Sequence, residues 1–164
     1  MATGAVEIVL GDFEQEKSQL RAIVTQSIQS QASLFVGRFL SDLPLPDGVR
    51  SRWATSKVVL RQYGCSLYVN APPALADARR AEIGLEEAET ALCGGRFDRV
   101  LLSQFLTAVD EGLLTAADVL QLVDARPRHV ALILTGCTAP PALRLRCGGD
   151  LEASRVDFLS RSRR

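Results

Sequence analysis

The sequence has few of the residues from which metal sites and covalent catalytic sites are built. Histidine occurs once, at His129, and the cysteines form no C-x-x-C pair; they are Cys65, Cys93, Cys137 and Cys147. A structural zinc site needs about four closely spaced Cys or His ligands. We therefore expect no metal site and four reduced thiols, and nothing ties His129 to a partner that would make it a general base.

Long hydrophobic runs and an excess of one charge are also missing. No window approaches the roughly 18 consecutive apolar residues of a membrane span, and the first residues do not have the pattern of a signal peptide. Lys and Arg number 19, as do Asp and Glu. We therefore expect no membrane segment and no nucleic-acid-binding surface, and we expect a cytoplasmic protein.

Length and hydrophobicity indicate one globular domain. The chain has 164 residues, of which 47% are hydrophobic, and a domain commonly has about 100–200 residues. We find no internal repeat and no low-complexity linker. A single domain is expected over residues 1–160, followed by a short basic tail at 161–164.

Apolar runs alternate with segments of helical periodicity along the whole chain. The runs predict strands at 6–10, 33–40, 57–69 (as one strand or two), 99–106, 129–136 and 155–159, and helices follow residue 12 and lie within 74–92, 113–127 and 139–149. Continuous apolar strands alternating with helices are typical of a parallel sheet covered on both faces. The predicted fold class is α/β, with three layers and a mostly parallel sheet.

The stretch GDFEQEKS follows the first predicted strand and has both ends of a phosphate-binding loop. Gly11, Lys17 and Ser18 fit the motif G-x-x-x-x-G-K-[ST], in which backbone N–H groups and the lysine hold phosphates. The positions between them carry three carboxylates, at Asp12, Glu14 and Glu16. Carboxylates in a phosphate cradle repel the ligand by about 1 kcal/mol per pair at 4 Å even in water.

The same letters also fit an ordinary helix start. Asp12 can cap the helix with Gln15 in the reciprocal position of a capping box, while Glu14 and Glu16 complement the helix dipole. A further alternative is that these carboxylates bind a cation or a basic partner segment. The residues alone leave the three interpretations open.

The predicted strand at 99–106 lacks the acid that a phosphate-loop enzyme places at a neighbouring strand end to hold magnesium. Ser103 and Gln104 stand where that carboxylate is expected. No charge is available there for a metal ion.

The second half of the chain, from Phe97 to Arg146, resembles the ATP:corrinoid adenosyltransferases, a family of phosphate-loop proteins. That family reads approximately D-x-V-V-L-D-E-x-N-x-A, then L-x-x-E-E-V-L-x-x-L-x-x-R-P, then a strand ending in L-T-G-R-G-A. Matching positions in this chain are Asp98, Val100, Leu101, Leu102, Leu114, Asp118, Val119, Leu120, Arg126, Pro127, Leu134, Thr135, Gly136, Ala139 and Leu143. The first half matches more weakly, with VGRFLSD where the family has V-V-Q-F-I-K-G.

The resemblance implies a sheet of the P-loop NTPase type, a homodimer, and descent from an enzyme that transfers the 5′-deoxyadenosyl group of ATP to a reduced corrinoid. It also implies which positions are functional. Lys17, Ser18, Thr135 and Gly136 agree with the family at nucleotide-site positions, and Gly11 opens the loop. We interpret these as a vestigial cofactor-binding set.

The departures from the family fall on functional positions. The loop T-G-N-G-K-G-K-T-T has lost its three glycines, the Asp-Glu pair has become neutral, and the arginine of T-G-R-G-A is absent. The altered residues are Asp12, Glu14, Glu16, Ser103, Gln104, Cys137 and Thr138. Neutral drift would not be expected to spare the apolar pattern while removing these groups together.

We therefore expect a non-catalytic descendant that serves as a protein-binding or regulatory module, with no catalytic residues and no cofactor. Its partner is expected to be a second copy or another protein. The alternative is a divergent ATP:cob(I)alamin adenosyltransferase or an ATP-binding protein of cobalamin metabolism, and only that alternative calls for Mg-ATP and a corrinoid. The sequence names neither the partner nor the pathway.

Overall fold

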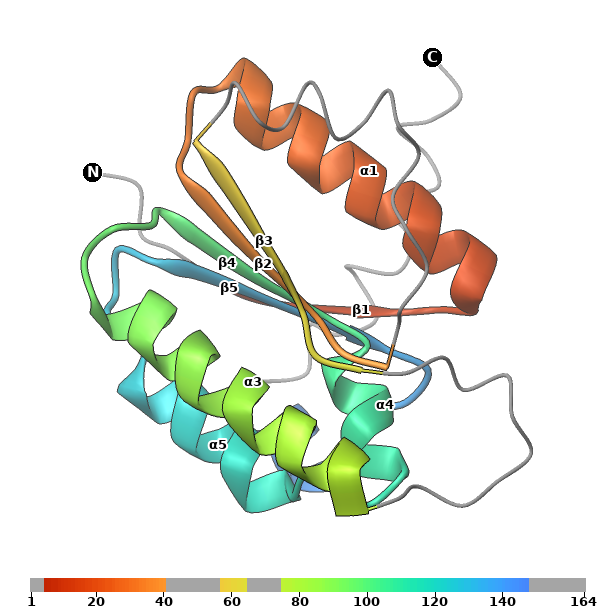
Figure 1. Ribbon diagram of the computed structural model, residues 1–164. Coiled ribbons are helices and arrows are strands. Elements are labelled where there is room, and N and C mark those ends of the chain that lie inside the picture. The colour runs from red at the N-terminus through yellow and green to blue at the C-terminus, as the bar shows by residue number, and fades with distance from the viewer. Residues whose placement is uncertain (1–4, 41–56, 65–74, 148–164) are drawn as a thin grey trace.

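The computed structural model describes residues 5–40, 57–64 and 75–147, whose strands form one parallel β-sheet (Figure 1). Its strand order is β1-β5-β4-β2-β3, and every neighbouring pair is parallel. The strands are β1 (Val6–Leu10), β2 (Leu34–Arg38), β3 (Val58–Gln62), β4 (Arg99–Ser103) and β5 (Ala131–Gly136). The α/β class predicted from the alternating pattern is confirmed.

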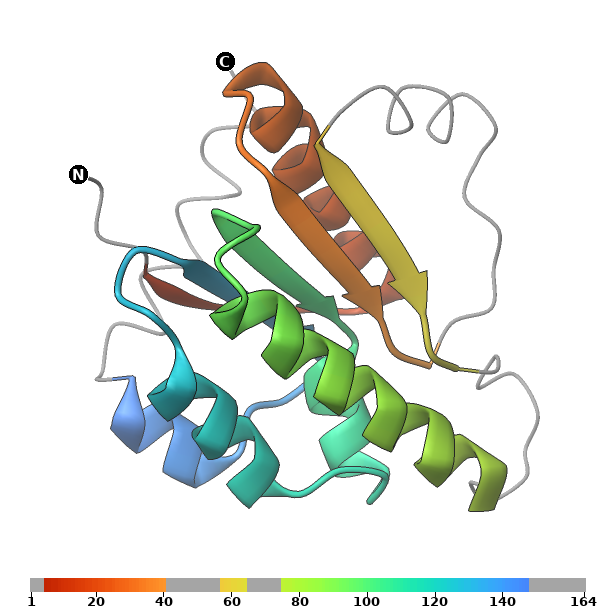
Figure 2. The ribbon, with the colours of Figure 1, turned by 60° about the vertical axis from the view of Figure 1, so that its left-hand side comes forward.

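Helices cover both faces of the sheet, which gives three layers. One face is covered by α1, and the other described helices lie on the opposite face (Figures 1 and 2). The helices are α1 (Phe13–Gln29), α3 (Leu75–Cys93), α4 (Phe105–Asp110), α5 (Ala116–Ala125) and α6 (Pro141–Arg146).

Each face of the sheet has its own hydrophobic core. On the α1 side, Leu20, Ile23 and Val24 pack against strand residues that include Leu101 and Ile133. The larger core lies under α3, α4, α5 and α6. The central strands β4 and β5 are therefore buried on both faces, as continuous apolar runs predict.

Helix α3 packs closely on the sheet at Gly84. A Cβ atom there would lie 2.7 Å from the Phe39 ring and 2.8 Å from the Tyr63 ring. The two rings are tilted at 46° to each other, with centroids 5.3 Å apart. Glycine at this position lets the helix backbone approach the aromatic side chains.

Asp98 ties together the amino ends of β2 and β4. Its carboxylate accepts hydrogen bonds from the backbone N–H of Ser33 at 2.8 Å and from the Ser33 hydroxyl at 2.9 Å. These bonds lower the pKa of Asp98. Asp98, which matches the family pattern, therefore has a structural contact at the amino ends of the strands, away from the candidate site.

The strand predicted over 99–106 is wrong beyond Ser103. Gln104 has a positive φ of 58° and ends the strand, and Phe105–Asp110 forms α4. The residues from Val100 to Ala108 are all buried, so no alternation of buried and exposed positions marks the change from strand to helix. Periodicity cannot distinguish a short buried helix from a buried strand.

Several predictions fall outside the described residues. These are the irregular connection after Leu40, the second part of the 57–69 strand, the strand at 155–159 and the tail at 161–164. The single-domain boundary at residue 160 therefore stays a prediction. Within the described ranges, no helix is both long enough and apolar enough to cross a membrane.

Candidate functional site

The candidate site is the edge of the sheet where the parallel strands end. Ligands of open α/β sheets bind outside the carboxyl ends of the strands, and Gly11, Arg38, Ser103 and Gly136 lie at those ends. The strand ends are held together by the backbone. Gly11 N–H donates to the Gly136 carbonyl at 3.1 Å, and Phe39 N–H donates to the Ser103 carbonyl at 2.9 Å.

The connection from β1 to α1 is too short to be a phosphate loop. Only Gly11 and Asp12 separate the strand from the helix. The Asp12 carboxylate accepts from Gln15 N–H at 2.8 Å, and the Gln15 side-chain oxygen accepts from Asp12 N–H at 3.0 Å. The predicted capping box is confirmed, and positions 13–16, which form part of the loop in the family pattern, are the first turn of a helix.

Glu16 turns inward from that first turn and is buried, with 6% of its surface exposed. Its Oε1 accepts hydrogen bonds from the hydroxyls of Ser103 and of Thr135, the latter at 2.9 Å. Its Oε2 accepts from the side-chain amide of Gln104. A carboxylate from α1 is thus bound by side chains of β4, of the residue after β4, and of β5.

Gln104 completes this network. Its backbone N–H donates to the Thr135 hydroxyl at 3.0 Å, and its side-chain oxygen accepts from the Thr107 hydroxyl at 2.5 Å. Only 1% of Gln104 is exposed. Because a buried polar group without a partner is costly, the contacts of this side chain are what make its burial tolerable.

Arg38, at the end of β2, supplies positive charge to the same edge. It is 8% exposed. Burial lowers the pKa of its guanidinium, and the negative charge of Glu16 acts in the opposite direction. The edge therefore contains a carboxylate and a guanidinium that are both withdrawn from solvent.

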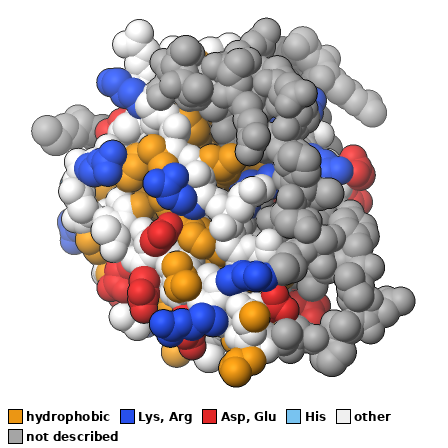
Figure 3. Space-filling model, in the orientation of Figure 1, with side chains coloured by type: hydrophobic (Ala, Val, Ile, Leu, Met, Phe, Trp, Pro, Cys, Tyr) orange, Lys and Arg blue, Asp and Glu red, His pale blue; other side chains and the backbone are white. Residues whose placement is uncertain are grey.

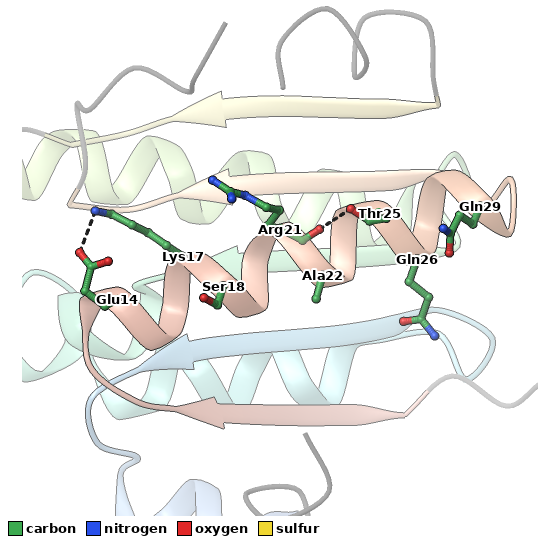
Figure 4. Close-up of a pocket in the computed structure, with 8 residues that line it drawn as sticks. All are labelled: Glu14, Lys17, Ser18, Arg21, Ala22, Thr25, Gln26 and Gln29. Carbon is green, nitrogen blue, oxygen red and sulfur yellow. Dashed lines mark hydrogen bonds and ion pairs between the residues drawn. The ribbon is translucent and has the colours of Figure 1, made fainter. Parts of the chain in front are cut away.

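The residues that fit the phosphate-loop motif are not brought together. Lys17 and Ser18 lie on the exposed outer face of α1, along a hollow of about 590 Å³ (Figure 4). The Lys17 ammonium pairs with the Glu14 carboxylate at 3.1 Å. Gly11 lies against Gln15, whose side-chain oxygen would be 2.7 Å from a Cβ at that position.

The T-G motif at the end of β5 is buried, whereas the two residues after it are exposed. Thr135 belongs to the Glu16 network. Gly136 lies against α4, where a Cβ would be 2.6 Å from that of Leu106. Cys137 and Thr138 are exposed, and the Thr138 hydroxyl donates to Asp110 at 2.5 Å.

The three loop carboxylates do not converge on a common point. Asp12 caps α1, Glu14 pairs with Lys17 at the surface, and Glu16 is buried among hydroxyl and amide donors. Within the described residues, no group of three His, Cys, Asp or Glu side chains is placed to hold a metal ion. This arrangement favours helix capping over the cation-binding interpretation of the loop.

Sequence reasoning missed the contact between the altered positions and the role of Arg38. The sequence does show an arginine inside the apolar run LFVGRFL, which could have marked a buried cation in need of a carboxylate. It also shows a carboxylate gained at position 16 alongside carboxylates lost at 103 and 104. Only the fold shows that these positions, 87 and 88 residues apart, meet.

Replacing Asp12 with alanine should lower the free energy of unfolding by about 1 kcal/mol, because the capping hydrogen bond to Gln15 N–H is lost. Urea denaturation followed by circular dichroism measures this change. Asp12→Asn is the matched control, since asparagine caps about as well as aspartate. Equal losses in the two variants would contradict a capping role.

A family model described as ATP:corrinoid adenosyltransferase BtuR/CobO/CobP matches residues 4–148. The match extends from before β1 to the end of α6, so it includes every strand and helix described above. A search of curated proteins found no match to the chain.

Proposed function

Because the chain belongs to the ATP:corrinoid adenosyltransferase family, we propose that it is a non-catalytic member that acts as a protein-binding or regulatory module. The observation that carries the proposal is the buried Glu16 carboxylate at the carboxyl ends of the strands. A fixed negative charge lies where a phosphate-loop protein binds a polyanion. The partner would be a second copy of the chain or another protein, in the cytoplasm.

The residues present do not fit ATP. Phosphates are held by loop N–H groups and a lysine that reaches over them. Here positions 13–16 are helical, and Lys17 points along the outer face of α1 toward Glu14. The donors that remain at the edge, on Ser103, Gln104 and Thr135, already bind a carboxylate.

The residues present do not fit magnesium either. Mg²⁺ prefers carboxylates and phosphate oxygens in octahedral geometry. Ser103 and Gln104 offer no charge, and both direct their donor groups at Glu16. We therefore derive no catalytic step through a nucleotide or a metal ion.

The surface charge supports a protein partner over a nucleic acid. Positive and negative side chains are interspersed over the described part of the face that carries α3 and α5 (Figure 3). The formal net charge is zero. Nucleic-acid binding by contrast depends on clustered Lys and Arg that neutralise phosphates.

Calorimetric titration with Mg-ATP, with and without a reduced corrinoid, is expected to give no saturable heat. The melting temperature should also be the same with and without Mg-ATP, since a ligand selective for the folded state would raise it. Lys17→Ala is the matched control and should behave as the wild type does. A micromolar dissociation constant that is lost in Lys17→Ala would overturn the proposal in favour of a divergent adenosyltransferase or ATP-binding protein.

A further inference from the structure

The two carboxylate oxygens of Glu16 bind different donors in the network formed with Ser103, Gln104 and Thr135. Oε1 binds the two hydroxyls, of Ser103 and Thr135, while Oε2 binds the amide of Gln104. All three partners are neutral donors. The network therefore contains one negative charge, and it joins α1 to β4 and β5.

A second carboxylate at position 104 would meet the first one directly. The Gln104 amide nitrogen contacts Glu16 Oε2, so a glutamate there would place an oxygen against an oxygen in a buried site. Like charges in contact repel strongly where solvent is excluded. The guanidinium at Arg38 balances only one of them.

We propose that Glu16 is a built-in ligand that closes this edge of the sheet, and that neutral side chains at positions 103 and 104 are a condition of the closure. With the Glu16 carboxylate in place, the edge does not accommodate a further carboxylate at the end of β4. The carboxylate gained in the loop and the carboxylates absent at 103 and 104 are therefore one coupled change. This inference rests on the proposed function and adds the contact that keeps the edge closed.

A double-mutant cycle with Glu16→Gln and Gln104→Glu tests the coupling. In the double variant the amide and the carboxylate exchange places, so the 16–104 hydrogen bond is kept with donor and acceptor reversed. The side-chain oxygen of residue 16 can still accept from Ser103 and Thr135, and that of residue 104 can still accept from Thr107. In Gln104→Glu both positions carry a carboxylate, and neither can donate to the other unless one takes up a proton. In Glu16→Gln the 16–104 bond is kept only if an amide nitrogen faces partners that now meet an oxygen.

The readout is the equilibrium constant between folded and unfolded protein, measured by urea denaturation at pH 7 without nucleotide. Gln104→Glu should lower this constant at least tenfold more in the wild type than in the Glu16→Gln background. Gln121→Glu, on the exposed face of α5, adds the same charge away from the network and should have equal effects in both backgrounds.

Additive effects, equal within threefold in the two backgrounds, would overturn the inference. If Gln104→Glu fails to fold while the double variant folds, the inference is supported, and if the double variant also fails to fold it is overturned. These outcomes are separate from those of the Mg-ATP titration. Saturable nucleotide binding by the wild type would contradict the proposed function, but the double-mutant cycle would still test the coupling between positions 16 and 104.

Discussion

Replacing Glu16 with alanine is expected to lower the free energy of unfolding by about 3 kcal/mol, the range observed when one partner of a buried charged network is removed. The variant leaves the Ser103 hydroxyl and the Gln104 amide buried without the acceptor they bind in the wild type. It also removes the negative charge that acts on Arg38. Urea denaturation monitored by circular dichroism measures the change.

Glu14→Ala is the matched control for Glu16→Ala. Both glutamates lie in the first turn of α1, but the Glu14 side chain is 83% exposed and pairs with Lys17 at the surface. Exposed ion pairs contribute about 0–1 kcal/mol. If the two variants lost the same free energy of unfolding, the hydrogen bonds of the buried Glu16 would contribute no more to stability than the surface ion pair of Glu14.

Replacing Phe105 with alanine is expected to cost about 3–5 kcal/mol, because a fully buried aromatic side chain leaves a cavity. Phe105 has no exposed surface, and its ring lies edge-on to that of Phe39 with centroids 5.1 Å apart. It is the first residue of α4, directly after the turn at Gln104. The same denaturation experiment measures the loss.

Leu145→Ala is the control for Phe105→Ala, since Leu145 is 85% exposed on α6. Surface substitutions usually change stability by less than about 0.5 kcal/mol. A loss at Phe105 below about 1 kcal/mol would contradict the cavity estimate and with it the packing of α4 against the core.

Most of the fold could be predicted because each strand is a short apolar run between turn residues. The runs at β1 and β5 end at Gly11 and Gly136. Thr115 and Asp118, three residues apart, form the capping box that starts α5, within the helix predicted over 113–127. The family assignment rested on the spacing of such positions and is confirmed. The helix α4 was predicted wrongly as the end of a strand, because its first four residues, Phe105–Ala108, are all buried and show no helical periodicity.

The site could be predicted only in part. The capping box of α1 depends on residues three apart and is readable from the sequence. The Glu16 contacts depend on the crossover that brings α1 over β4 and β5, and no local pattern encodes it. The loss of nucleotide binding stays a prediction, which the titration with Mg-ATP tests.

The two-residue connection between β1 and α1 has a consequence for any ligand that would need an open loop. Opening it means unwinding the turn from Phe13 to Glu16 and withdrawing the carboxylate from its donors. The open state that could bind the ligand is then a minor population, and the apparent dissociation constant is the intrinsic one divided by the fraction of molecules in that state. An opening cost of about 3 kcal/mol would weaken binding about 150-fold before any contact with the ligand is made.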